Sequence, residues 1–131
     1  MDTLKWEHKK ENYKKALAAL EEAVLEYQKN PENKTIRAGL IQHFEFCIEL
    51  AWKLLKFQLE EGLNQQSTSP KEVVRAAYEA KLINNGELWL KMLSDRNDSS
   101  HNYDEALAQK LCEEIIGPYA TTLKTLHDSL Q

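Results

Sequence analysis

The sequence predicts an all-α protein, folded as an antiparallel up-and-down bundle of four long helices and one short helix. Apolar residues recur at steps of three and four along most of the 131 residues, which is the spacing of one helix face. No run that alternates apolar and polar residues predicts a strand. With only 4 Gly and 3 Pro, the chain also lacks the turn residues of a β-sandwich. We therefore expect residues 1–131 to form a single helical-bundle domain.

The first two long helices are predicted on either side of a turn at residues 30–33. The first carries one apolar stripe, made of Trp6, Tyr13, Leu17, Leu20, Val24 and Tyr27. Asn30 and Pro31 should end it, because the residue before a proline is disfavoured in a helix. The second helix, from Thr35 to about Leu63, is apolar around more than half of its circumference. We expect it to pack on two sides or to form an oligomer interface.

The second half of the chain predicts a short helix and two longer ones. A short helix should run from Pro70 to about Leu82, with Ser69 as its N-cap. The next should begin after the break at residues 84–86 and end within residues 96–100. The last should begin with a capping box in which Asn102 and Glu105 bond each other's backbone amides. Gly117 and Pro118 should kink or split this last helix.

Composition excludes several classes of function. With 17 Lys and Arg against 21 Asp and Glu, the net charge is −4, so bulk charge cannot drive binding to nucleic acid. If the protein binds a phosphate group, a few specifically positioned side chains must bind it. No apolar run approaches the roughly 20 residues that span a bilayer, and the first thirty residues are too charged for a signal peptide. We expect a soluble, cytoplasmic protein with no membrane partner.

Metal and cofactor sites are not predicted either. The four glycines are scattered, so no glycine-rich phosphate loop is present and no cofactor is expected. The four histidines are spread along the chain, and no ligand cluster predicts a metal. Cys47 and Cys112 are far apart in the sequence, and we expect both to be small buried apolar residues.

The segment RNDSSHNY, residues 96–103, is the candidate functional site. Arg96 and His101 are five residues apart, which on an unbroken helix is about 140° around the axis. We expect the turn-forming residues after Arg96, including Asn97 and Asp98, to end the helix and support the site by letting the two side chains converge. A guanidinium that holds phosphate oxygens and an imidazole that exchanges protons are a minimal pair for metal-independent cleavage through the ribose 2′-hydroxyl.

Two plainer interpretations stay open for the polar residues. Residues 96–103 can be an exposed loop in which Arg96 pairs with Asp95 or Asp98 and His101 is solvated. On the second helix, Glu45, Glu49 and Lys53 stand at steps of four, which favours pairs that stabilise the helix over a role in a cleft.

The spacing Arg-x-x-x-x-His-x-Tyr at residues 96, 101 and 103 resembles the signature of HEPN-fold proteins. The resemblance is to the small HepT-like, or nucleotidyltransferase substrate-binding, family. It extends to residues 42–53, QHFEFCIELAWK, to Asn97 after the arginine, and to the order of elements over nearly the whole chain.

This resemblance implies a function and partners. It implies an all-α homodimer whose two motifs line one cleft, and a separate small nucleotidyltransferase of the minimal type, encoded nearby. It implies a toxin that cleaves RNA at a site formed by Arg96 and His101, silenced when the partner adenylylates Tyr103. The older family name implies an alternative, a non-catalytic subunit that binds a nucleotide or other substrate for the transferase. A third interpretation is an inert dimeric bundle.

Overall fold

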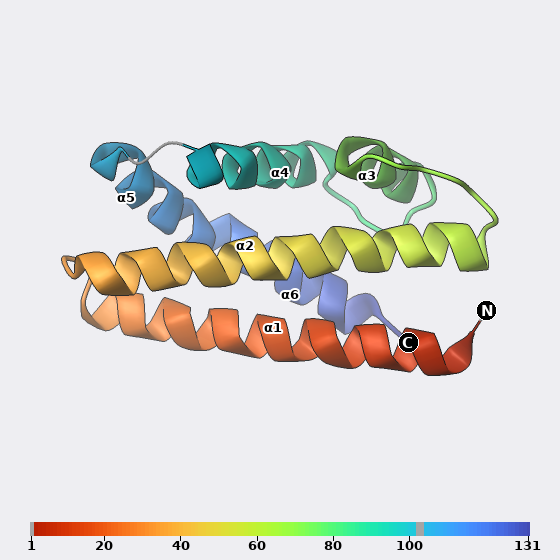
Figure 1. Cartoon of the computed structure of the whole chain (residues 1–131), viewed down its shortest axis with the longest axis horizontal. Coiled ribbons are helices and arrows are strands. Elements are labelled where there is room, and N and C mark those ends of the chain that lie inside the picture. The colour runs from red at the N-terminus through yellow and green to blue at the C-terminus, as the bar shows by residue number, and fades with distance from the viewer. Residues whose placement is uncertain (1, 102–103) are drawn as a thin grey trace.

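Six α-helices and two π-helical turns make up the described part of the computed structural model, residues 2–101 and 104–131 without the side chains of residues 100 and 101. Figure 1 shows α1 (Thr3–Lys29) and α2 (Lys34–Phe57) antiparallel and side by side, with α3 (Pro70–Glu79) and α4 (Gly86–His101) along the other side of α2. The helices α5 (Glu105–Glu114) and α6 (Ala120–Ser129) cross behind α2 in this view.

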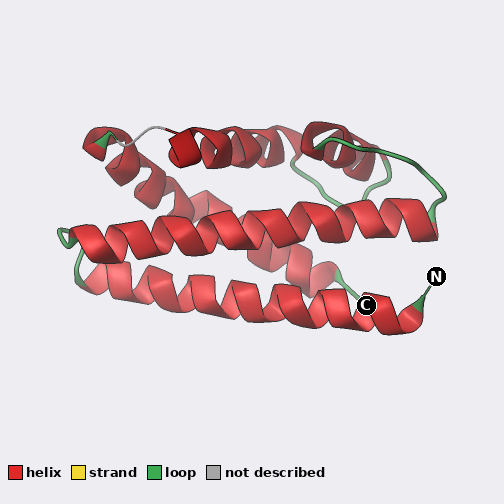
Figure 2. Cartoon of the chain, viewed as in Figure 1, coloured by secondary structure: helices red, strands yellow, loops and turns green. Residues whose placement is uncertain are grey.

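The predicted all-α bundle is confirmed. Figure 2 shows helices and loops throughout the described residues, and no strand among them. The kink predicted at Gly117 and Pro118 is a π-helical turn, Ile115–Tyr119, that joins α5 to α6, and Gly117 has non-helical angles there (φ −105°, ψ −108°). Counted as one kinked helix, α5 and α6 complete four long helices, with α3 as the short one.

The core contains residues of every α-helix in the described part of the chain. The predicted stripe of α1 is buried, except that Val24 is half-buried. Tyr13 donates a hydrogen bond to the carbonyl of Leu123 at 2.7 Å and so joins α1 to α6. The rings of Phe44 on α2 and Tyr119 stack with centroids 5.4 Å apart. The second contact joins α2 to the turn between α5 and α6.

The α2 helix is buried on most sides, as its apolar circumference predicted. It continues into a π-helical turn, Gln58–Gly62, so the helical segment ends about where the sequence predicted. Phe46 differs from the other large apolar side chains of α2, because it is 59% exposed. An exposed phenylalanine on the central helix is consistent with an interface on that face.

The α3 helix begins as predicted but ends earlier. Ser69 is its N-cap, and the Ser69 hydroxyl oxygen accepts a hydrogen bond from the Glu72 backbone amide at 3.2 Å. The predicted end at Leu82 is wrong, because the helix stops at Glu79 and Lys81 takes the left-handed region at φ +63°. The amides of Leu82 and Lys81 bond the carbonyls of Ala77 and Tyr78, which is a Schellman cap. The cap uses lysine where glycine is usual, so composition gave no stop signal.

Lys81→Gly is expected to stabilise the protein. A Cβ in the left-handed region destabilises the folded state by roughly 1–2 kcal/mol. Glycine removes this strain, but it also stabilises the unfolded state by about 0.4–1 kcal/mol, because it gives the unfolded chain more conformational freedom. The free energy of unfolding, measured with urea, should rise by about 0.5–1 kcal/mol. Lys81→Ala is the matched control, since it removes the same charge and keeps the Cβ. Equal stability of the two variants would contradict a strained cap.

The end of α4 and the start of α5 both differ from the prediction. The prediction that residues 97–100 end the fourth helix is wrong, because α4 continues to His101. The Ser99 hydroxyl lies 2.9 Å from the Arg96 carbonyl and 2.7 Å from Glu45 of α2, and these contacts offset the weak helix propensity of the segment. The last helix begins at Glu105 with Asp104 as its N-cap. The predicted cap residue, Asn102, lies outside the described residues.

Two further expectations bear on chemistry. Cys47 and Cys112 are both buried and unpaired, as predicted, and burial raises their pKa values to about 12 and about 11. Both thiols therefore stay protonated and are poor nucleophiles near neutral pH. In the part of the chain that the structure describes, no helix combines the length and the apolar character needed to cross a membrane.

Candidate functional site

The C-terminal part of α4 contacts α2 through Arg96 and Ser99. Arg96 forms an ion pair with Glu49, whose carboxylate oxygen Oε2 is 3.5 Å from the arginine Nη2. Both side chains are about one-third exposed, at 33% and 32%. The guanidinium is therefore held between two helices while part of it remains open to solvent. An arginine in this setting is restrained and charged, and it keeps an accessible edge for a phosphate.

Glu49 is itself held by two residues of its own helix. The Trp52 indole donates to Glu49 Oε2 at 3.2 Å, and Lys53 Nζ lies 3.5 Å from Oε1. The Glu49–Lys53 contact is one of the helix-stabilising pairs that the steps of four favoured. The same carboxylate also reaches Arg96 across the helix interface. Glu49 thus restrains both its own helix and the candidate phosphate-binding arginine.

One turn away, Glu45 contacts the end of α4. The Ser99 hydroxyl is 2.7 Å from Glu45 Oε2, and a charged carboxylate is a stronger acceptor than the Arg96 carbonyl nearby. Glu45 and Glu49 are one turn apart on α2, and Arg96 and Ser99 are about one turn apart on α4. The two contacts therefore fix α4 in rotation and in axial position just before His101.

A third contact fixes the residue before Arg96. The buried phenol of Tyr119 donates to Asp95 Oδ2, and burial, followed by this hydrogen bond, raises the Tyr119 pKa well above its usual value. Lys91 lies 5.5 Å above the Tyr119 ring and 3.2 Å from Glu114. The sequence pattern did not predict this cluster. Its signal was faint, a tyrosine in the apolar stripe of the last helix.

The structure brings some of the predicted residues together and leaves others apart. Asn97 and Asp98 are exposed on α4. His101 is the last residue of α4, and only its backbone is described. All of Tyr103 lies outside the described residues. Because α4 is unbroken from Arg96 to His101, the two positions are about 140° apart around the axis. The predicted convergence through a helix end between them is therefore wrong.

A cavity of about 940 Å³ opens beside these contacts, between α2, α4 and α5. Asp95, Asp98 and Ser99 line it from α4, and Glu45 lines it from α2. Among the described residues, its wall carries four basic and six acidic ones: Lys34, Arg37, Lys91, Lys110, Glu45, Asp95, Asp98, Asp104, Glu105 and Glu114. The volume suits a small ligand. The mixed charge does not by itself select an anion.

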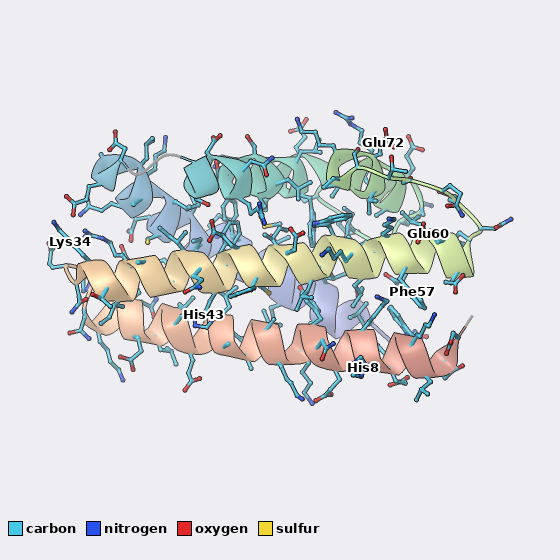
Figure 3. The ribbon with its side chains drawn as sticks, viewed as in Figure 1. His8, Lys34, His43, Phe57, Glu60 and Glu72 are labelled. Atoms are coloured by element: carbon cyan, nitrogen blue, oxygen red, sulfur yellow. The ribbon has the colours of Figure 1, made fainter. Side chains whose placement is uncertain are left out.

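The described histidines lie away from these contacts. Figure 3 shows His8 along α1 and His43 on the side of α2 that faces α1. His127 lies on α6, 3.4 Å from Asp128. Among the residues that the structure describes, no three His, Cys, Asp or Glu side chains converge as the ligands of a metal ion would.

Comparison with known proteins assigns the chain to a family. Residues 8–131 match the family model described as "Nucleotidyltransferase substrate binding protein like". The chain belongs to this family. The family assignment confirms the resemblance found in residues 42–53 and 96–103.

Two known proteins are similar to this chain, one in sequence and one in both sequence and structure. A protein of Haemophilus influenzae named "Probable ribonuclease HepT" is 34% identical over 85 residues, which are 62% of this chain and 58% of that protein. The chain thus spans less than two-thirds of this curated relative's length. A crystal structure of a protein from Thermus thermophilus matches with a TM-score of 0.76 and 32% identity, covering 87% of this chain and 94% of the other.

Proposed function

We propose that the protein is a metal-independent ribonuclease, the toxin half of a two-gene toxin–antitoxin module. The observation that carries the proposal is the Arg96–Glu49 ion pair at the α2–α4 contact, which holds a partly exposed guanidinium five residues before His101. The probable ribonuclease of Haemophilus influenzae supports the same activity. The arginine would stabilise the charge on the phosphate, and the histidine would transfer the proton.

The proposed reaction uses the substrate's own 2′-hydroxyl as nucleophile. His101 accepts the 2′-hydroxyl proton, and the 2′ oxygen forms a bond to phosphorus. The bond from phosphorus to the 5′ oxygen breaks, and that oxygen takes a proton as it leaves. The products are a 2′,3′-cyclic phosphate and a 5′-hydroxyl end. Arg96 is matched to the extra negative charge that develops on the phosphate oxygens in the transition state.

A homodimer would place two motifs around one substrate. Because α4 is unbroken, the two positions of one motif are on different sides of the helix. A second copy whose motif lines the same cleft would supply groups from the other side, so that an arginine and a histidine can reach one phosphate. We place the dimer contact on the face of α2 that carries Phe46, between Glu45 and Glu49 in the sequence.

Phe46→Glu is expected to convert the dimer to a monomer. Light scattering of the wild type at micromolar concentration should give about twice the 15.2 kDa of one chain, and the variant should give one chain. Leu25→Glu on α1 is the matched control, because Leu25 is 58% exposed and Phe46 is 59% exposed. A wild-type monomer, or equal dissociation by the two variants, would contradict this interface.

An RNA-cleavage assay tests the function. Purified protein should cleave a defined RNA in the presence of a chelator of divalent metals. It should leave the same sequence intact when every 2′-hydroxyl carries a methyl group, because the nucleophile is then blocked. Cleavage that stops with the chelator, or that proceeds on the methylated strand, would contradict the proposed chemistry.

The family's description favours a second candidate function. A nucleotidyltransferase substrate-binding subunit would use the cavity to hold a nucleotide or other substrate for a separate small transferase, and would perform no chemistry. Isothermal titration of the purified protein with the transferase's substrate would detect this binding. Binding without RNA cleavage would support the second function, and cleavage would support the first.

A further inference from the structure

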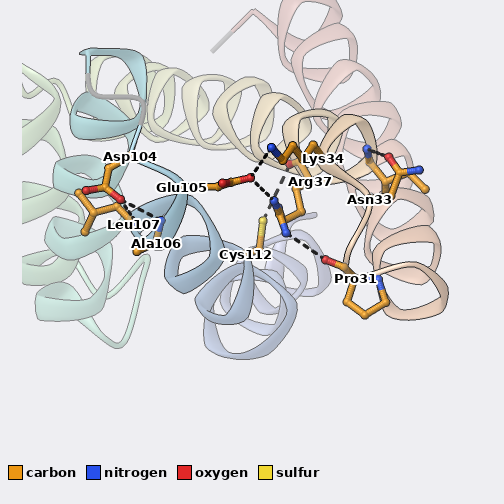
Figure 4. A network of polar contacts seen from close by, with 10 residues as sticks. Pro31, Asn33, Lys34, Arg37, Asp104, Glu105, Ala106, Leu107 and Cys112 are labelled. Atoms are coloured by element: carbon orange, nitrogen blue, oxygen red, sulfur yellow. Dashed lines mark hydrogen bonds and ion pairs between the residues drawn. The ribbon is translucent and has the colours of Figure 1, made fainter.

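Arg37 is the one charged residue among the buried residues of the described part, with 5% of its surface exposed. It lies near the start of α2, in register with the buried Leu40 and Phe44 one and two turns later. Figure 4 shows where its side chain goes. Its Nη1 donates to the Pro31 carbonyl at 3.3 Å, and its Nη2 is 2.9 Å from Glu105 Oε1.

Two contacts to Arg37 hold α5. Glu105, the first residue of α5, accepts a hydrogen bond from the Arg37 guanidinium. Two turns later, the Cys112 thiol donates to the Arg37 carbonyl at 3.9 Å. Contacts at two points on the same face fix both the rotation of α5 and its axial position against α2. Lys34 adds a second cation 3.2 Å from the same Glu105 oxygen, but its side chain is 79% exposed. Arg37 is therefore the stronger restraint.

The position of this contact bears on the motif. Four peptide steps separate His101, which ends α4, from Glu105, which begins α5. Such a span reaches at most about 14 Å, so the start of α5 lies close to the end of α4. Glu45 and Glu49 of α2 fix the α4 end through Ser99 and Arg96. Arg37 and Glu105 fix the other end.

Stability alone does not explain a buried arginine at this site. The Arg37 side chain is 6% exposed, whereas its partner Glu105 is 57% exposed, so the arginine is desolvated and its carboxylate partner is open to solvent. Removing a charge from water is costly, and such a residue is a weak source of stability. An apolar residue at position 37 would continue the stripe of α2. An arginine there instead supplies a directed fork that binds one carboxylate and one carbonyl in fixed geometry.

We propose that Arg37 and Glu105 are positioning residues for the RNA-cleaving motif. They hold the start of α5 and thereby the end of the segment that carries His101 and Tyr103. This inference rests on the proposed ribonuclease function. It predicts that loss of the Arg37–Glu105 contact slows the chemical step while RNA binding and the global fold are kept.

The test uses Arg37→Met and Glu105→Gln in the full chain. Arg37→Met leaves no buried charge, since the Glu105 side chain is 57% exposed and keeps its contact with Lys34. Tyr27→Phe is the matched control: Tyr27 donates to Glu113 at 2.8 Å, so the control removes one side-chain hydrogen bond from the other end of α5. Hydrogen exchange of residues 106–108, unfolding by urea, and kcat and KM for a defined RNA are measured on each protein.

Both variants should exchange faster than wild type at residues 106–108, with Tyr27→Phe unchanged there. Their kcat should fall by about 10- to 100-fold, the scale of a small misplacement of a reacting group, with KM unchanged. Wild-type exchange at residues 106–108 in both variants would overturn the inference, as would a kcat equal to that of the control. Should the wild type cleave no RNA, the proposed function fails, and the exchange measurement still decides whether the contact holds α5.

Discussion

Arg96→Ala is expected to lower the rate of RNA cleavage by about 10²- to 10³-fold, because the variant loses the group that stabilises charge on the phosphate. The fold should be kept. Glu49 retains its contacts with Trp52 and Lys53, so removal of the arginine leaves no isolated buried charge. Single-turnover cleavage of a defined RNA measures the rate, and the free energy of unfolding is measured in parallel.

Three companion variants sharpen this result. Arg96→Lys keeps the charge but loses the planar fork, so its rate should lie between wild type and alanine. Arg75→Ala removes an exposed arginine from α3 and should cleave at the wild-type rate. His101→Ala should be about as slow as Arg96→Ala if both groups act on one phosphate. Equal rates for Arg75→Ala and Arg96→Ala would show that the site is misassigned.

Tyr103→Phe is expected to keep much of the nuclease activity and to escape silencing by the partner nucleotidyltransferase. We propose the modification that the family resemblance implies: the Tyr103 oxygen bonds the α-phosphorus of ATP, pyrophosphate leaves, and the phenol proton is lost. The attached adenylate would bring a negative phosphate two residues from His101. There it would compete with RNA for Arg96 and occupy the space the substrate needs.

Mass spectrometry after co-expression with the partner transferase tests this switch. The wild type should carry adenylate mass on the peptide that contains Tyr103, and Tyr103→Phe should carry none there and should remain an active nuclease. Tyr78→Phe is a suitable control, because Tyr78 is a half-exposed tyrosine on α3. Adenylate only on other residues, or none beside an active transferase, would rule out Tyr103.

Periodicity predicted the fold because most of each helix is set by burial. The α1 stripe, the Ser69 cap and the kink at Gly117 depend on local pattern and on the chemistry of proline and glycine. The ends of α3 and α4 depend on something else. Lys81 adopts a left-handed cap that its residue type does not signal, and α4 continues to His101 through a contact between Ser99 and Glu45. Local propensity carries no information about that distant carboxylate.

The site was predictable only in part for a similar reason. The spacing of Arg96, His101 and Tyr103 singled out the motif, and the resemblance gave it a chemistry. The residues that hold the motif come from other helices. The sequence could have singled out Arg37, because its spacing from Leu40 and Phe44 places it on the same apolar face of the helix. Its partner Glu105 could not be predicted in this way, because it is 68 residues away. Pairing across that distance depends on the packing of α5 against α2.

Analysis of the cleaved RNA ends tests the central claim most directly. A defined RNA is incubated with the purified wild-type protein and a chelator of divalent metals, and the fragments are identified by mass spectrometry. Attack by the 2′-hydroxyl predicts fragments that end in a 2′,3′-cyclic phosphate, paired with fragments that begin with a 5′-hydroxyl, and far fewer of both with Arg96→Ala. Intact RNA, or fragments with 5′-phosphate and 3′-hydroxyl ends, would contradict a metal-independent ribonuclease at Arg96 and His101.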